Sequence, residues 1–254
     1  MDKWRDDILI RGQAIRGELA RHALLVRQSR PPGVRGPSAR LVLGEIAGLA
    51  RRSRGAGPAG KARHPQPVML IPGFGSHPLR MRAMRRELEA AGHFVTDWGQ
   101  GFNLGPTADN FAALLERIER FSIACGRPVV LVGWSLGGLF AREAAQILPG
   151  AVAKIITMGT PFSGDRRANN AWRAYQLVTG HSVDDPPIPG TFAGKPPVPT
   201  IALWSPRDGV VSPRSACGRK HERDRAVALR CTHLGFVTDP ESIATVLSEL
   251  DRAG

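Results

Sequence analysis

Three cysteines are all that the 254-residue chain contains, and their spacing is not that of a zinc site. They are also too few for a disulfide scaffold. Cys217 and Cys231 could pair in an oxidising compartment, but we expect unpaired, buried thiols. Clusters of His and Asp with the spacing of metal ligands are lacking too, so we expect neither a metal ion nor another cofactor.

Long hydrophobic runs are also missing. No segment approaches the roughly 20 apolar residues of a membrane-spanning helix. The opening residues 1–7 are partly acidic and lack the apolar core of a secretory signal, so a cytoplasmic location is the default expectation, with peripheral membrane association left open. The chain has no zinc finger, recognition-helix signature or aromatic-interleaved basic strand, so we expect no nucleic-acid partner.

Lysine is scarce, yet the net charge is +13 at pH 7, because arginine is abundant. Residues 1–66 hold 14 Lys and Arg against 5 Asp and Glu, so the excess lies mainly in this segment. A basic segment of this kind could contact anionic lipid or an acidic partner. The abundance of arginine, alanine and glycine is equally typical of a compositional bias.

The pattern of residues 1–66 predicts a basic helical arm followed by a linker. Apolar residues recur every three or four positions from Trp4 to Val26, which places them on one face of a helix over about 3–27. A second short helix is predicted over 39–52, and 51–66 has the composition of a linker. The apolar stripe could pack on the rest of the protein, lie on a bilayer or pair with another subunit; we favour the first.

Residues 67–254 alternate between short apolar runs and amphipathic segments. This alternation predicts an α/β protein with a doubly wound, mostly parallel sheet of about six strands. The predicted strands are 68–71, 94–96, 129–132, 154–158, 200–204 and 226–230, and the predicted helices are 79–91, 107–125, 139–148 and 240–252. Proline and glycine in residues 162–199 predict a loop-rich excursion, either a lid over a pocket or a plain surface loop.

The most informative stretch is VVLVGWSLGG at residues 129–138, in which G-x-S-x-G is centred on Ser135. A serine at a turn between a buried strand and a helix adopts a strained backbone conformation that exposes its hydroxyl. Gly133 and Gly137 let the strand and the helix approach each other closely. The pattern therefore predicts Ser135 as a nucleophile.

A serine hydroxyl needs an adjacent base, and the base needs an acid that orients it. In this kind of fold the acid and then the base follow the serine along the chain. Of the histidines after Ser135, His181 lies in the excursion and His221 in a charged cluster, whereas His233 directly follows a predicted strand. Asp208 follows the preceding strand, where its alternative role is that of a turn residue. Because neighbouring parallel strands end side by side, we predict a catalytic triad of Ser135, His233 and Asp208.

An oxyanion hole requires two backbone N–H donors. We expect one from Leu136, the residue after the nucleophile, and one from Phe74 in the glycine-rich loop after the first strand. The apolar surroundings suit an acyl chain. Trp134, Phe162 and Trp172 are candidates for the wall of the substrate pocket.

These motifs, in this order, resemble those of the α/β-hydrolase family of serine esterases and lipases, over about residues 67–252. The resemblance extends to a bacterial lipase-like group with P-G-F-G, G-W-S-L-G-G and G-[ST]-P-F motifs, here at 72–75, 133–138 and 159–162. It implies the same roles for Ser135, Asp208 and His233 but does not choose a substrate; we expect hydrolysis of a small-molecule or lipid carboxylic ester through an acyl-enzyme. A thioesterase, amidase or polyester depolymerase would use the same triad, and a membrane-surface binding protein acting through its arm is an alternative of another class.

Overall fold

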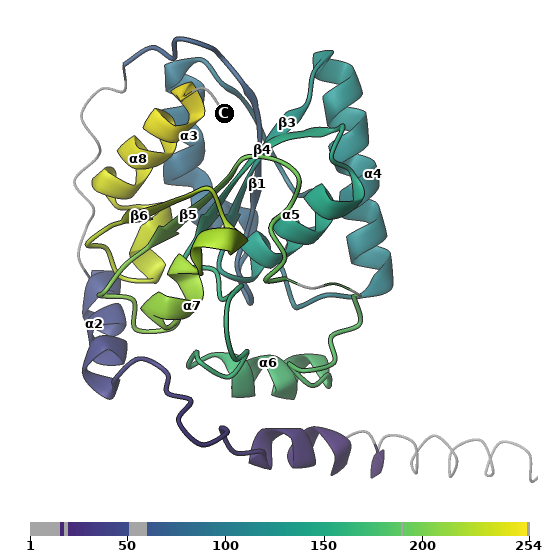
Figure 1. Cartoon of the computed structure of the whole chain (residues 1–254), viewed down its shortest axis with the longest axis vertical. Helices are drawn as coiled ribbons and strands as arrows, with labels where there is room; N and C mark the ends of the chain where they lie inside the picture. The colour runs from purple at the N-terminus through teal and green to yellow at the C-terminus, as the bar shows by residue number, and fades with distance from the viewer. Residues whose placement is uncertain (1–15, 18–19, 51–59, 189, 191, 253–254) are drawn as a thin grey trace, which may run out of the picture.

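The computed structural model describes residues 16–17, 20–50, 60–188, 190 and 192–252. Within them, six parallel strands form one sheet in the order β2-β1-β3-β4-β5-β6 (Figure 1). The strands are β1 (Pro67–Ile71), β2 (Phe94–Asp97), β3 (Val129–Trp134), β4 (Val152–Met158), β5 (Thr200–Trp204) and β6 (Arg225–Ala228). The predicted α/β class with a mostly parallel sheet is confirmed.

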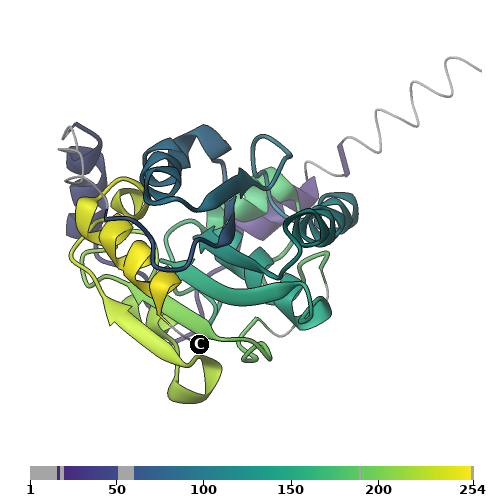
Figure 2. The same cartoon turned by 90° about the horizontal axis from the view of Figure 1, so that it is seen from above.

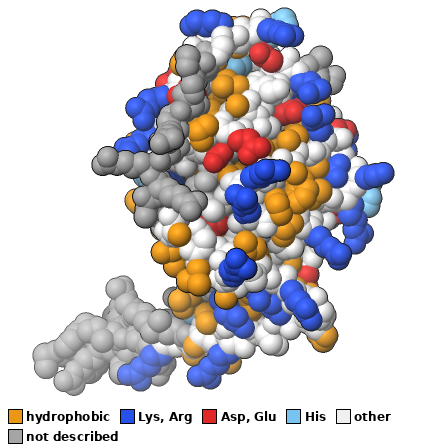
Figure 3. Space-filling view, turned by 90° about the vertical axis from the view of Figure 1, so that its left-hand side faces the viewer, with side chains coloured by type: hydrophobic (Ala, Val, Ile, Leu, Met, Phe, Trp, Pro, Cys, Tyr) orange, Lys and Arg blue, Asp and Glu red, His pale blue; other side chains and the backbone are white. Residues whose placement is uncertain are grey.

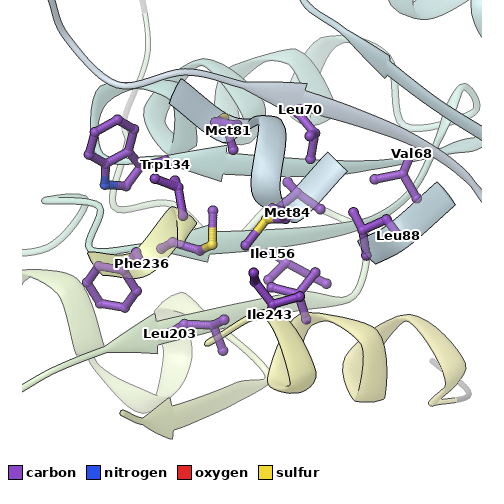
Figure 4. Close-up of a cluster of buried hydrophobic side chains, with 14 of the residues drawn as sticks. Val68, Leu70, Met81, Met84, Leu88, Trp134, Ile156, Leu203, Phe236 and Ile243 are labelled. Atoms are coloured by element: carbon purple, nitrogen blue, oxygen red, sulfur yellow. The ribbon is translucent and has the colours of Figure 1, made fainter. Parts of the chain in front are cut away.

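Helices cover both faces of this sheet (Figure 2). Helices α3 (Arg82–Ala91) and α8 (Pro240–Asp251) pack on one face, and α4 (Ala108–Cys125) and α5 (Leu136–Ile147) pack on the other. Successive strand residues point to opposite faces, so Val68 and Leu70 join the first layer (Figure 4) while Met69 and Ile71 join the second. Strands buried on both sides explain the continuous apolar runs in the sequence.

Some element boundaries differ from the predicted ones, and several short helices were not predicted. Helix α5 begins at Leu136, directly after the serine, and not at 139; β6 ends at Ala228 and not at 230. The excursion 162–199 contains a helix that the pattern did not predict. The helices that were not predicted are too short to display a clear period of 3.6 residues; they are α6 (Trp172–Thr179), α7 (Pro213–Cys217), η2 (Lys220–Glu222) and η3 (Leu234–Val237). The first turn of the predicted helix 79–91 is a separate short helix, η1 (Pro78–Met81).

The described part of the arm lies along the carboxyl edge of the sheet. Residues 20–27 are helical and run beside α6 (Figure 1), where the Gln176 side chain donates a hydrogen bond to the Leu25 carbonyl at 2.6 Å. Helix α2 (Ala39–Ala50) follows and contacts η3. The predicted helix positions 3–15 and 18–19, and residues 51–59 of the predicted linker, lie outside the described residues.

None of the helices described is long and apolar enough to cross a membrane. All three cysteines are free, and burial raises the pKa of the Cys231 thiol. In the described part of the chain, no group of three His, Cys, Asp or Glu side chains is placed to hold a metal ion.

Candidate active site

Ser135 lies in a sharp turn between β3 and α5. Its φ of 54° makes it the one non-glycine residue with a positive φ among those that the structure describes. A Cβ on Gly133 would lie 2.5 Å from the Gly137 carbonyl oxygen, and a Cβ on Gly137 would lie 2.2 Å from the Ile71 carbonyl oxygen. The turn therefore requires glycine at both positions, as the sequence indicated.

The Asp208 and His233 side chains form a buried hydrogen bond of 2.8 Å between Oδ2 and Nδ1. Asp208 follows β5 and His233 follows β6, and these two strands pair in parallel. The second oxygen of Asp208 accepts the N–H groups of Val210 and Val211 at 2.8 and 2.7 Å. A carboxylate held in this way fixes the imidazole with Nδ1 as the donor, which leaves Nε2 for proton transfer.

Trp134 connects the imidazole to the turn that carries the serine. The Trp134 indole N–H donates to the His233 carbonyl at 3.1 Å, and the two rings have centroids 5.7 Å apart. Ser135 itself donates its backbone N–H to the Met158 carbonyl at the end of β4. A Cβ on the next residue, Gly159, would lie 3.0 Å from His233 Nδ1, so the imidazole packs against the strand end adjacent to the serine.

The N–H groups of Phe74 and Leu136 have no hydrogen-bond acceptor within the described residues. Leu136 is the first residue of α5, where backbone N–H groups lack a partner within the helix. The Phe74 loop lies against the serine, because a Cβ on Gly73 would be 3.1 Å from the Ser135 Cβ. Two unpaired donors beside a serine are what an oxyanion hole requires.

Asn103 holds the Phe74 loop in place and was not singled out from the sequence. The side chain is fully buried and donates to the Pro72 carbonyl at 2.7 Å. Its backbone accepts the Gly75 N–H at 2.7 Å and donates to the Ser76 carbonyl at 3.0 Å. The only signal was the stretch 101–107, GFNLGPT, which is similar to the same bacterial lipase-like group as the motifs quoted above.

Glu45, from α2 of the arm, is a second residue that sequence reasoning missed. Its Oε1 accepts the N–H of Gly209 at 2.8 Å and the N–H of His233 at 2.6 Å, and its Oε2 accepts the N–H of Leu234 at 2.9 Å. The side chain is only 4% exposed. A single carboxyl group therefore connects the loop after Asp208 with the loop that carries the imidazole.

The close approach of α2 also explains the glycine after Asp208. A Cβ on Gly209 would lie 2.5 Å from the carbonyl oxygen of Leu41. Glycine at this position therefore allows the close contact with the arm as well as the turn. No periodic pattern marks Glu45, since it is one acidic residue in a basic, amphipathic segment.

A pocket of about 360 Å³ opens beside Ser135. Phe162 and Trp172 line it, whereas Trp134 lies in the hydrophobic core against His233 (Figure 4). Most of the lining is apolar, which suits an acyl chain. The lining includes Phe74, Leu136, Arg166, Asn169, Tyr175 and Phe192.

The excursion 162–199 forms much of this wall, and polar contacts hold it from two sides. From α5, the buried Arg142 donates to the carbonyls of Phe192 and Gly194 at 2.7 and 3.0 Å. Burial lowers the pKa of Arg142 to about 10. From the arm, Arg30 donates to the carbonyls of Arg167 and Asn169 at 3.0 and 2.8 Å.

Comparison with known proteins finds a match to a family of hydrolases. Residues 68–240 match the sequence profile of the alpha/beta hydrolase family. The pimeloyl-[acyl-carrier protein] methyl ester esterase of Methylococcus capsulatus is 34% identical over 126 residues, which are 44% of this chain and 43% of that protein. The chain therefore matches less than half the length of this curated relative.

Solved structures share the fold at low sequence identity. The 2-hydroxy-6-oxo-6-phenylhexa-2,4-dienoate hydrolase of a Rhodococcus strain superposes with a TM-score of 0.54 at 18% identity, over 76% of this chain and 92% of that one. A lipase of Bacillus licheniformis in its propeptide form superposes with a TM-score of 0.57 at 17% identity, over 77% of this chain and 53% of that one. At such identities the likeness concerns the fold alone.

Proposed function

Because the chain belongs to the alpha/beta hydrolase family, we propose that it hydrolyses carboxylic esters, with Ser135 as nucleophile, His233 as base and Asp208 as the orienting acid. The observation that carries this proposal is the buried 2.8 Å hydrogen bond between Asp208 and His233 at the sheet edge where the strained serine lies. The esterase named as a relative supports an ester substrate.

In this mechanism, Ser135 Oγ attacks the ester carbonyl carbon while its proton passes to His233 Nε2. The carbonyl oxygen becomes an oxyanion that accepts hydrogen bonds from the N–H groups of Phe74 and Leu136. The bond to the alcohol then breaks, and the imidazolium returns the proton to the leaving oxygen. Water repeats the sequence on the acyl-enzyme: it attacks the acyl carbon, His233 takes its proton, and Ser135 regains a proton as the acid departs.

Release of p-nitrophenol from short- and medium-chain acyl esters tests the proposal. Ser135→Ala is expected to lower kcat by about a millionfold, because the nucleophile is lost. Ser122→Ala, which changes a serine near the end of α4, is the matched control and should keep full activity. Turnover that survives Ser135→Ala, or a wild-type protein inactive on every chain length, would refute the proposal.

We also propose that the arm and α6 contact an anionic membrane surface. Leu177 and Val178 on α6 are 54% and 52% exposed, and Leu24 on the adjacent arm helix is 67% exposed. Exposed Arg27 and Arg173 belong to the same two helices. Basic side chains are widespread on the side of the molecule that Figure 3 displays. Exposed apolar side chains with arginine beside them suit the interface of an anionic bilayer.

A further inference from the structure

Arg166 is the one charged side chain that lines the pocket, among the described residues. Asn169, another polar residue in the lining, uses its side-chain amide for hydrogen bonds to the backbone of the excursion. Its Nδ2 donates to the Arg166 carbonyl at 2.7 Å, and its Oδ1 accepts the Ala171 N–H at 2.9 Å. The remaining wall is chiefly aromatic and aliphatic. Binding of an apolar acyl chain does not require a guanidinium group in such a wall.

The backbone around α6 holds this guanidinium in a defined position. Its Nη1 donates to the carbonyls of Val183 and Asp184 at 2.9 and 3.2 Å, and its central carbon lies 5.1 Å from the centroid of the Phe192 ring. Nε and Nη2 have no acceptor within the described residues. A fixed guanidinium with unused donors is suited to bind a carboxylate.

The neighbouring carboxyl groups leave Arg166 without an ion-pair partner in the described part of the chain. Asp184 pairs with Arg167 through its side chain and offers Arg166 only its backbone oxygen. Glu143 lies behind the wall against Gly190, where burial raises its pKa and the charges of Arg142 and Arg166 oppose that rise, but it forms no ion pair with Arg166. The positive charge of Arg166 is therefore available to a ligand in the pocket.

We propose that Arg166 forms a subsite for a carboxylate at the far end of the acyl chain. The substrates of this class are monoesters of dicarboxylic acids, whose free carboxylate contacts the guanidinium while the ester carbonyl lies at Ser135. The inference rests on the proposed function for its reaction and adds a substrate class to it. If Arg166 only stabilised the excursion, its replacement would change the hydrolysis of charged and neutral esters to the same extent.

Two esters of matched length test the subsite: p-nitrophenyl hydrogen adipate, which carries a free carboxylate, and its methyl-capped diester, which does not. For Arg166→Met, the ratio of kcat/KM for the charged ester to that for the neutral ester is expected to fall about 10- to 100-fold, the effect of losing charge-assisted hydrogen bonds. Arg166→Lys should restore part of the ratio, since a point charge remains.

Arg120→Met is the matched control, because it removes one exposed arginine, on α4, that does not line the pocket. It should leave the ratio unchanged. An unchanged ratio in Arg166→Met would overturn the subsite while the proposed function stands. If both esters lose activity equally in Arg166→Met, the residue only braces the excursion, and the subsite is again refuted.

Binding provides a readout that does not depend on turnover. Calorimetry should show that the Ser135→Ala variant binds methyl hydrogen adipate more tightly than dimethyl adipate. Adding Arg166→Met to this variant should abolish the difference in affinity. Equal affinities of the two compounds for Ser135→Ala would overturn the subsite even if the wild-type protein hydrolysed neither p-nitrophenyl ester. Failure of the proposed function alone would leave the difference in affinity intact.

Discussion

At the scale of single residues, backbone strain at Ser135 is the most direct consequence of building this site. Its φ of 54° and ψ of −120° belong to a region that residues with a Cβ avoid. Surrounding contacts fix this conformation. Gly133 and Gly137 allow the strand and helix backbones to approach closely, and the Ser135 N–H donates a hydrogen bond to the Met158 carbonyl. Strain of this kind costs about 1–3 kcal/mol and persists when surrounding contacts fix it.

Relief of that strain is measurable by comparing two inactive variants. Ser135→Gly should be more stable than Ser135→Ala by about 1 kcal/mol, because the relieved strain exceeds the greater flexibility of glycine in the unfolded chain. Chemical denaturation of both variants gives the difference in the free energy of unfolding. If Ser135→Gly is no more stable than Ser135→Ala, the turn is not strained.

At the scale of elements, α2 acts on the site through one side chain. Glu45 accepts three backbone N–H groups, and these belong to the loops that follow β5 and β6. Both loops are irregular, so their positions depend on such contacts rather than on a ladder of strand hydrogen bonds. We infer that Glu45 is a positioning residue for Asp208 and His233.

Glu45→Ala should therefore lower both stability and kcat. Each buried N–H left without an acceptor costs about 1–3 kcal/mol. Displacement of the imidazole by a fraction of an ångström to one ångström reduces turnover by up to about 100-fold. Glu45→Gln should be intermediate, because its one oxygen can still serve Gly209 and His233 while its NH₂ faces the N–H of Leu234.

The measurement combines ester hydrolysis with proton NMR of the His233 Nδ1–H, whose low-field signal reports the bond to Asp208. A merely structural role would lower the melting temperature but leave kcat per folded molecule and the NMR signal unchanged. Glu116→Ala is the control, since this glutamate lies exposed on α4 and pairs with Arg120 on the same helix.

The elements themselves were largely predictable, because most have a strong local pattern. All six strands were expected close to their observed positions, since a buried parallel strand appears as a short apolar run. Helix α6 was not expected: it spans eight residues between proline- and glycine-rich segments, its Trp172 and Tyr175 line the pocket, and its Gln176 bonds to the arm. Its formation depends on those partners.

At the scale of the whole molecule, the charge of +13 favours anionic surfaces. If the arm and α6 contact such a surface, Leu177→Glu with Val178→Glu should reduce cosedimentation with vesicles that contain an anionic phospholipid. Binding by the wild-type protein should weaken as salt rises, because salt screens the attraction between exposed charges.

Ile123→Glu with Ile147→Glu is the matched control, because it adds the same two negative charges at residues that are 79% and 51% exposed on α4 and α5 rather than on α6 or the arm. It should bind vesicles like the wild type. Equal loss of binding in the control and in the Leu177 and Val178 variant would indicate attraction by net charge alone. No binding by the wild-type protein would remove the membrane proposal.

The sequence by itself determined the sheet, the turn at Ser135 and the chain order of the proposed acid and base. These features have local patterns: apolar runs, obligatory glycines, and polar residues directly after strands. The tertiary structure decided which side chains meet across long separations, such as Glu45 with the His233 loop and Arg166 with the pocket. Such contacts pair one side chain with a distant backbone or cavity, and no spacing along the chain encodes them.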